Sequence, residues 1–104
     1  METNMTHENF TRHVATKFQV ETERGKVELE LTDVSELKST PGQEQFAIIF
    51  RGPKETFLGQ GTQLFKHEQM GEFALFIVPI RNDGKGYYYE AVFNRFLKTN
   101  EVVG

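Results

Sequence analysis

The chain has 104 residues, a formal net charge of −3 and no cysteine. This length predicts one domain, and the fold needs no disulfide bond. Basic residues form no run or cluster, which argues against nucleic acid as a partner, and no stretch of 18 apolar residues predicts a membrane span. The polar N-terminus lacks a signal-peptide pattern, so we expect synthesis in the cytoplasm, with export or incorporation into a particle left open.

The first predicted element is a short helix near the N-terminus. We expect residues 1–5 to be disordered and Thr6 to cap a helix that ends at about Val14. The helix carries little apolar surface beyond Phe10 and Val14. It is therefore predicted to be a small lid and not a core helix.

From Lys17 onward the apolar residues recur with a period of two, which is the period of a β-strand. Near Asp33 this alternation slips, which predicts a bulge or a strand end, and Pro79 predicts an edge position or a strand end. The stretch over residues 38–45, with its Pro41-Gly42 pair, is predicted to be a loop. Predicted strands cover residues 17–22, 26–34, 46–52, 62–68, 72–80 and 86–94.

Turn residues separate these strands, and no alternation of strand and helix occurs. The fold is therefore predicted to be mainly β: a single compact antiparallel barrel or sandwich of six to seven strands with one short N-terminal helix. The β domain is expected to span residues 6–94, with a C-terminal extension over residues 95–104 that lengthens the last strand or forms a short helix.

The second half of the chain carries several short motifs. They are Phe50–Pro53 (FRGP), Gln60–Thr62 (QGT), His67 ahead of Gly71, Leu75–Ile80 (LFIVPI) and Tyr89–Asn94 (YEAVFN). In their order and spacing these motifs resemble an uncharacterised family of small bacterial domains with no assigned activity. The resemblance implies that genes for phage-tail-collar-like or fibre-like proteins often lie near genes for such domains.

Residues that could support catalysis or bind a metal are sparse. A metal site would need His67, Glu68 and Glu72 to converge, and structural zinc takes about four ligands. We favour the simpler interpretation that His67 ends a strand beside a tight turn and forms local hydrogen bonds. We therefore predict no catalytic residue, no cofactor and no metal.

Two charged residues of the second half have a structural and a functional interpretation. Glu90 lies among aromatic residues and would act as an acid or base if its pKa were raised, but we favour a salt bridge to Arg51, Arg81 or Lys85. Arg51 would either meet an acidic partner or screen the end of an edge strand, and we favour the second role.

Three predicted strands carry apolar or aromatic side chains on both faces. In the last of them Tyr87, Tyr89 and Phe93 face one way, while Tyr88 and Val92 face the other. Such a second face is usually covered. The cover would be the N-terminal helix, the tail, or another protein chain. The apolar residues of the tail are Phe96, Leu97, Val102 and Val103.

The sequence thus favours a non-enzymatic structural or interaction module. It would dock in a larger bacterial or phage-tail-like assembly, or self-associate, through the outer face of its C-terminal β-hairpin. The predicted interface residues are Ile49, Arg51, Phe76, Val78, Tyr88, Glu90, Val92 and Phe96. The alternatives are a barrel that binds a small ligand in an interior lined by Phe and Tyr and, last, an enzyme that uses Glu90 or His67.

Overall fold

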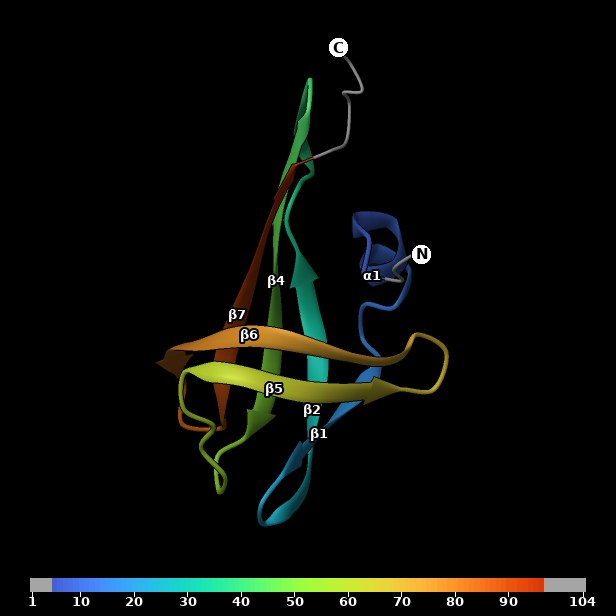
Figure 1. The fold of residues 1–104 in the computed structure, drawn as a ribbon. Helices are drawn as coiled ribbons and strands as arrows, with labels where there is room; N and C mark the ends of the chain where they lie inside the picture. The colour runs from blue at the N-terminus through green and yellow to red at the C-terminus, as the bar shows by residue number, and fades with distance from the viewer. Residues whose placement is uncertain (1–4, 97–104) are drawn as a thin grey trace.

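The computed structural model describes residues 5–96, which form one helix and seven strands (Figure 1). All strand pairs are antiparallel, and the order β2-β1-β5-β6-β7-β4 closes into a six-stranded barrel because β2 also pairs with β4, while β3 adds to the outer side of β4. The predicted antiparallel fold is confirmed, and of the two architectures the barrel is the one observed. The elements are α1 (His7–Arg12), β1 (Lys17–Thr22), β2 (Gly25–Val34), β3 (Lys38–Thr40), β4 (Gln43–Pro53), β5 (Gly61–His67), β6 (Gly71–Asn82) and β7 (Gly86–Phe96).

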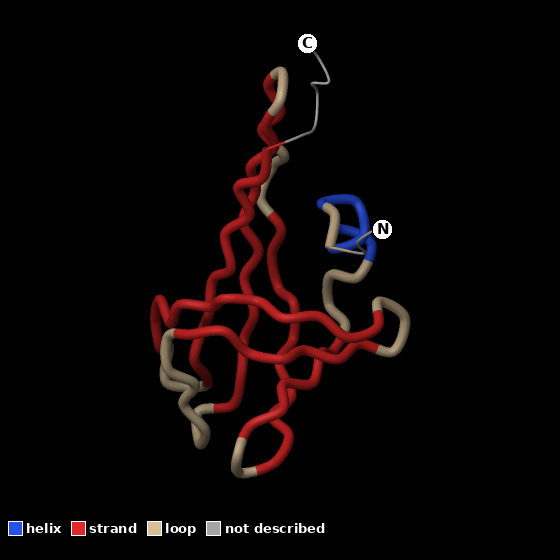
Figure 2. The backbone as a smooth tube through the Cα atoms, viewed as in Figure 1, coloured by secondary structure: helices blue, strands red, loops and turns tan. Residues whose placement is uncertain are grey.

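The barrel carries a long projection, which explains its principal extents of 51 × 25 × 24 Å. β5 and β6 cross steeply over β4 and β7, and the latter two continue well past the crossing (Figures 1 and 2). We call this projection the arm; it consists of residues 43–47 of β4, residues 91–96 of β7, and β3. The arm is therefore a small three-stranded sheet with one end anchored in the barrel.

Alternation along the strands explains which side faces the barrel interior. In β2 the side chains of Val27, Leu29 and Leu31 are buried, and the residues between them are charged. The register of β2 against β4 shifts between Leu31 and Asp33, which confirms the predicted bulge. The prediction for Pro79 is also confirmed, because β5 pairs with β6 only as far as Ile77 and Pro79 has a strand on one side alone.

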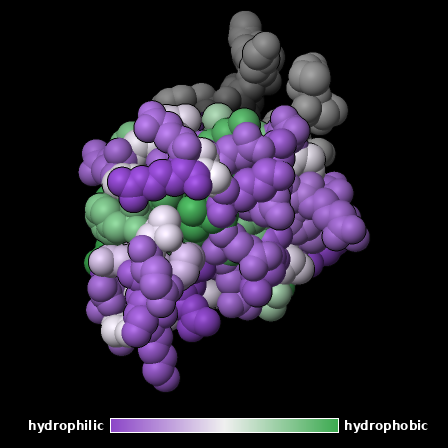
Figure 3. Space-filling view, turned by 90° about the horizontal axis from the view of Figure 1, so that it is seen from below, coloured by the Kyte–Doolittle hydropathy of each residue, from purple (hydrophilic) through white to green (hydrophobic). Residues whose placement is uncertain are grey.

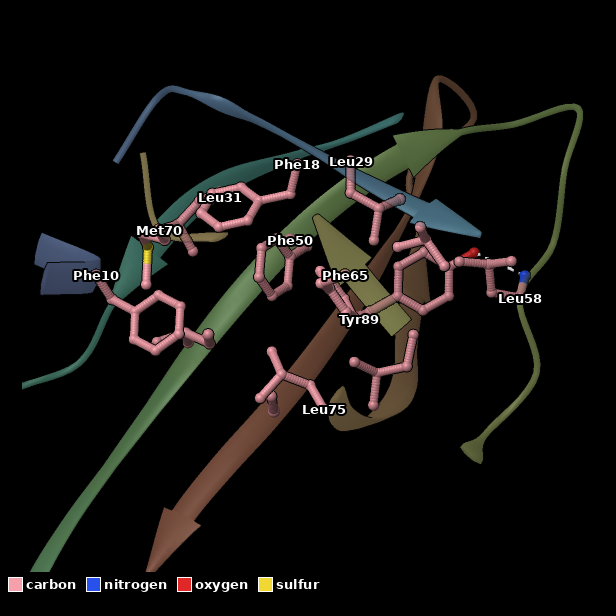
Figure 4. Packing of buried hydrophobic residues seen from close by; sticks show 14 of the residues in the cluster. Phe10, Phe18, Leu29, Leu31, Phe50, Leu58, Phe65, Met70, Leu75 and Tyr89 are labelled. Carbon is pink, nitrogen blue, oxygen red and sulfur yellow. Dashed lines mark hydrogen bonds between the residues drawn. The ribbon is translucent and has the colours of Figure 1, made fainter. Parts of the chain in front are cut away.

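Large side chains fill the interior of the barrel (Figure 4). The ring centroids of Phe18 and Phe50 are 5.3 Å apart, and those of Phe50 and Phe65 are 5.0 Å apart. Tyr89 is fully buried beside them, and its hydroxyl oxygen accepts a hydrogen bond of 2.9 Å from the backbone N–H of Leu58. This bond fixes the loop between β4 and β5 against the barrel end, and burial raises the pKa of Tyr89.

Helix α1 closes the opening between β6 and the arm. The Thr6 hydroxyl accepts a hydrogen bond of 3.1 Å from the Asn9 N–H, which confirms the predicted cap. Phe10 is 0% exposed, and its ring centroid lies 6.0 Å from that of Phe73 and 5.5 Å from that of Phe93. The helix is a lid, as predicted, but the expectation that it takes no part in the core is wrong.

The prediction of a loop over residues 38–45 is also wrong. β3 pairs with the start of β4 around a turn at Pro41 and Gly42, where Gly42 adopts a φ of 84°. The side chains of β3 are all exposed, so this segment shows no alternation of apolar and polar residues that would predict a strand. Backbone pairing at the end of the arm forms this strand without a hydrophobic signal in the sequence.

Candidate functional site

The predicted interface residues lie on the outer face of β4, β6 and β7, which points away from the barrel interior. Val92 is 67% exposed and Phe76 is 52% exposed, although both are large apolar residues. Ile49, Val78, Tyr88 and Glu90 are half-buried, and Arg51 is exposed. Phe96 ends β7, and its side chain lies outside the described part of the chain.

Strand register brings most of these residues together. Ile49 of β4 lies opposite Glu90 of β7, and Glu90 lies opposite Val78 of β6. One step along the same face, Ala47 lies opposite Val92. Phe76 is on the same face of β6 as Val78, two residues earlier. We call this group the outer patch; its members are Ala47, Ile49, Phe76, Val78, Glu90 and Val92.

Ala47 was missed by the sequence-based prediction, and the structure shows its place beside a hollow on the arm. The hollow has a volume of about 280 Å³, and its lining includes Ala47 and Val92 together with Ser35, Lys38 and Asn94. A small side chain opposite Val92 leaves room there. Alternation places Ala47 on the outer face, but only the register of β4 against β7 reveals the hollow.

Glu90 makes no salt bridge with any residue in the range 5–96, so the predicted bridge to Arg51, Arg81 or Lys85 is wrong. Arg51 of β4 and Arg81 of β6 both lie opposite Tyr88 of β7. The Arg81 guanidinium carbon lies 4.0 Å from the centroid of the Tyr88 ring, and hydrogen bonding to Tyr88 raises the pKa of Arg51. The Tyr88 hydroxyl in turn donates to Asp83 at 3.0 Å. Glu90 therefore remains a carboxylate without a cationic partner inside an apolar patch.

His67 ends β5 and forms local hydrogen bonds, which confirms the favoured interpretation. Its Nδ1 accepts hydrogen bonds from the backbone N–H groups of Gln69 and Met70 at 3.0 and 3.2 Å. The Thr16 hydroxyl donates to the carbonyl oxygen of His13, so the proton on Nε2 of His67 donates to Thr16 at 3.0 Å. Both ring nitrogens are engaged, and burial lowers the pKa of His67, with the charge of His13 as a second cause.

The described residues offer no other concentration of chemical groups. Within residues 5–96 no group of three or more His, Asp or Glu side chains is arranged to hold a metal ion. No helix in this range is long and apolar enough to cross a membrane. Hydrophilic side chains cover most of the barrel end opposite the arm (Figure 3).

Of the three expected covers of the second face, helix α1 is the one that lies within residues 5–96. Helix α1 does not cover the outer patch, because Phe10 packs against Phe18, Phe46, Phe73 and Phe93 on the inner side. The tail residues Leu97, Val102 and Val103 lie outside the described residues. No element within residues 5–96 lies over Val92 or Phe76, as their exposure shows.

Comparison with known proteins agrees with the resemblance seen in the motifs. No curated protein and no solved structure matches this chain. One family profile matches residues 5–93, which includes every described element except the last residues of β7. The chain therefore belongs to an uncharacterised family, described as a domain of unknown function (DUF6916).

Proposed function

We propose that this protein is a non-enzymatic module that docks in a larger bacterial or phage-tail-like assembly through the outer patch on its C-terminal hairpin. The observation that carries the proposal is the exposure of Val92 and Phe76, at 67% and 52%, on paired strands of the barrel. Large apolar side chains that lie exposed on one face of a domain commonly mark a contact surface. Strands hold these side chains in fixed positions, as a docking surface requires.

Glu90 defines the chemistry of the partner. Burying a carboxylate without a counter-charge is costly, and this carboxylate has no cationic partner among the described residues. A partner that covers the patch must therefore place a lysine or arginine against Glu90. Around that residue, the partner must present apolar side chains that pack against Val92, Ile49 and Phe76. This combination gives the interface both affinity and a preferred orientation.

The packed interior supports docking over binding of a small ligand inside the barrel. Phe18, Phe50, Phe65 and Tyr89 are each fully buried at the centre, where a ligand-binding barrel would have space. His67 supports the non-enzymatic interpretation, because its ring nitrogens are committed to structural hydrogen bonds. The phage-tail-like setting is suggested by the resemblance of the motifs.

Photocrosslinking tests the proposal directly. Phe76 is replaced by a photoreactive phenylalanine analogue, the protein is produced in its native cells, and adducts are identified by mass spectrometry after irradiation. We expect one recurrent adduct, because a docked partner would lie against the side chain of Phe76. The same analogue at Gln19, an exposed residue of β1, serves as the matched control.

Glu90→Lys in the same background tests the charge requirement. A reversed charge would repel the basic residue of the partner, so the adduct at position 76 is expected to disappear while the fold is retained. Adducts at position 76 that equal those at position 19, or that persist unchanged in Glu90→Lys, would contradict the proposal.

A further inference from the structure

Two histidines from different elements meet at the C-terminal end of helix α1. His13 is the C-cap residue of the helix, and His67 ends β5. Their ring centroids are 4.7 Å apart. The Nε2 atom of His13 also lies 3.0 Å from the side-chain oxygen of Gln69, in the turn between β5 and β6. His13 therefore joins the helix to the same turn that His67 holds.

The two rings differ in the charge that their surroundings accept. Nδ1 of His13 donates to the carbonyl oxygen of Asn9 at 2.8 Å, and the Gln69 amide can turn either its oxygen or its nitrogen toward Nε2. His13 thus keeps both hydrogen bonds whether its ring is neutral or protonated. Nδ1 of His67 instead faces two backbone N–H groups, so a proton there would break both bonds. Protonation of both rings would also place two positive charges side by side.

Helix α1 depends on its contacts with the rest of the chain. It has six residues, which is too short for a helix that is stable alone in water. Phe10 holds its middle, and at its first residue Nε2 of His7 donates to the carbonyl oxygen of Ser35 at 2.8 Å. His13 holds its other end. A short segment held in this way opens at a lower free-energy cost than the strands of the barrel.

The chain between the helix and β1 contains a strained residue. Ala15 adopts a φ of 74°, and no other non-glycine residue in the range 5–96 has a positive φ. This conformation is unfavourable for alanine, so movement of the helix would relax it. The Ala15 N–H donates to the carbonyl oxygen of Leu31 at 2.7 Å, and the Leu31 N–H donates to that of Thr16 at 3.1 Å. These bonds fasten the chain to β2 directly after the helix, so α1 can move while β1 stays in place.

Charged side chains reach His67 from the strands around it and from the turn. His67 borders a cleft of about 550 Å³, whose charged lining residues are Lys17, Glu28, Lys66, Glu68 and Glu72. The Glu28 carboxylate lies 4.0 Å from the Lys17 ammonium group. The Glu72 carboxylate lies 3.6 Å from the Lys66 ammonium group. Lysines therefore balance two of the three carboxylates in this cleft.

On the helix side, the charged group beside His13 is Arg12, which pairs with Glu8 at 3.0 Å. Burial is the main cause that lowers the pKa of His67, and the charge of His13 is the second. The charge of Glu68 acts in the opposite direction but is the smallest of the three causes. The closed arrangement therefore favours a neutral His67.

We propose that His13 and His67 form a pH-sensitive switch that releases helix α1 from the barrel in acid. Neutral His67 holds the turn, and the turn presents Gln69 to His13. When His67 takes up a proton, the turn loses two hydrogen bonds and the two rings repel each other. The helix then moves away and uncovers the rings that Phe10 contacts, which are those of Phe46, Phe73 and Phe93. These rings lie on the inner side, so the switch goes beyond the proposed docking role and does not depend on it.

Hydrogen exchange followed by NMR at pH 7, 6 and 5 tests the switch. The amides of Phe10 and His13 report on α1, because they donate to the carbonyl oxygens of Thr6 and Phe10. Protection factors, which compare the observed rate with that of an unstructured chain, remove the intrinsic pH dependence of exchange. We expect the two α1 amides to lose protection about tenfold, since uptake of one proton changes an opening equilibrium by at most about tenfold per pH unit. Val20, whose strand is paired on both sides, should stay about a hundredfold better protected.

Three single substitutions assign the effect to the histidine pair. His67→Asn removes the titrating group, so the protection of the α1 amides should change less than about threefold over the same range. His13→Gln removes the charge that faces His67 and should weaken the pH dependence. His7→Gln is the matched control in the same helix. Nε2 of His7 donates to a carbonyl oxygen in either charge state, so this variant should respond to pH as the wild type does.

Three outcomes would overturn the proposal. One is protection of the α1 amides that does not change with pH. Another is loss of protection to the same level at α1 and at Val20, because the whole domain would then unfold as one unit. The third is a wild-type response in His67→Asn. If His67→Asn fails to fold, His13→Gln is compared with His7→Gln, and equal responses of these two variants would exclude the switch.

Discussion

His67 holds the turn between β5 and β6 by accepting two backbone hydrogen bonds at Nδ1. Protonation of Nδ1 would replace an acceptor by a donor and break both bonds. Burial lowers the pKa of His67 in the folded state, so its neutral form contributes stability above the unfolded pKa of about 6.5. That contribution is lost as the pH falls through the lower, folded-state pKa.

We therefore expect the free energy of unfolding to decrease as the pH is lowered from 7 to 5. His67→Asn, which keeps an acceptor near Gln69 and Met70 but does not titrate, should show a flatter pH dependence. Urea unfolding at pH 7, 6 and 5 measures both slopes. Parallel slopes for the two proteins would show that His67 is not the titrating group.

Gly52 is required by close packing and not by backbone conformation. A Cβ atom at position 52 would lie 2.5 Å from Cδ2 of Leu29 and 3.4 Å from the ring of Tyr89. Both neighbours are fully buried, so neither can move aside at low cost. The glycine of the FRGP motif thus has a packing role.

Gly52→Ala is expected to destabilise the protein by roughly 1–3 kcal/mol through overpacking. Gly59→Ala is the matched control, because a Cβ atom at position 59 has no neighbour within 4 Å. Chemical denaturation compares the two variants. Equal effects on the free energy of unfolding would contradict the packing role of Gly52.

At the scale of elements, helix α1 contributes chiefly through one side chain. Phe10 lies between the rings of Phe46, Phe73 and Phe93 and so joins β6 to the arm. The salt bridge between Glu8 and Arg12 on the exposed side of the helix adds little, because exposed pairs contribute about 0–1 kcal/mol.

Phe10→Ala is expected to cost about 3–5 kcal/mol, as is usual for a buried Phe. Val14, which follows the helix and is partly exposed, provides the control, and Val14→Ala should change stability by less than about 0.5 kcal/mol. Thermal unfolding followed by circular dichroism compares them. A Phe10→Ala variant as stable as Val14→Ala would mean that α1 does not close the barrel.

The sequence predicted every strand that carries buried apolar residues, although β4, β6 and β7 extend by two or three residues beyond the predicted ends. β3 escaped prediction because all its side chains are exposed and its pairing uses the backbone alone. The pairings that close the barrel, β1 with β5 and β2 with β4, join segments far apart in the chain and leave no local signal. In the candidate site, alternation placed Phe76 and Val92 outward correctly, but it could not show that Arg51 and Arg81 lie opposite Tyr88 in the neighbouring strands.

At the scale of the whole molecule, the barrel has a packed interior and an outer patch that no element within residues 5–96 covers. Neighbouring residues of β6 represent the two sides: Leu75 is 5% exposed and faces the interior, whereas Phe76 is 52% exposed and belongs to the outer patch. If the chain's own ends sheltered Phe76, its truncation would create a cavity and cost stability. If Phe76 is kept for another protein, its truncation would cost the isolated domain almost nothing.

The most direct measurement is therefore the free energy of unfolding of Phe76→Ala and Leu75→Ala in dilute solution, where self-association is absent. We expect a loss of about 2–5 kcal/mol for Leu75→Ala and a change within about 0.5 kcal/mol for Phe76→Ala. A loss of about 2 kcal/mol or more for Phe76→Ala would show that the chain covers its own outer patch, and the docking surface would have no basis.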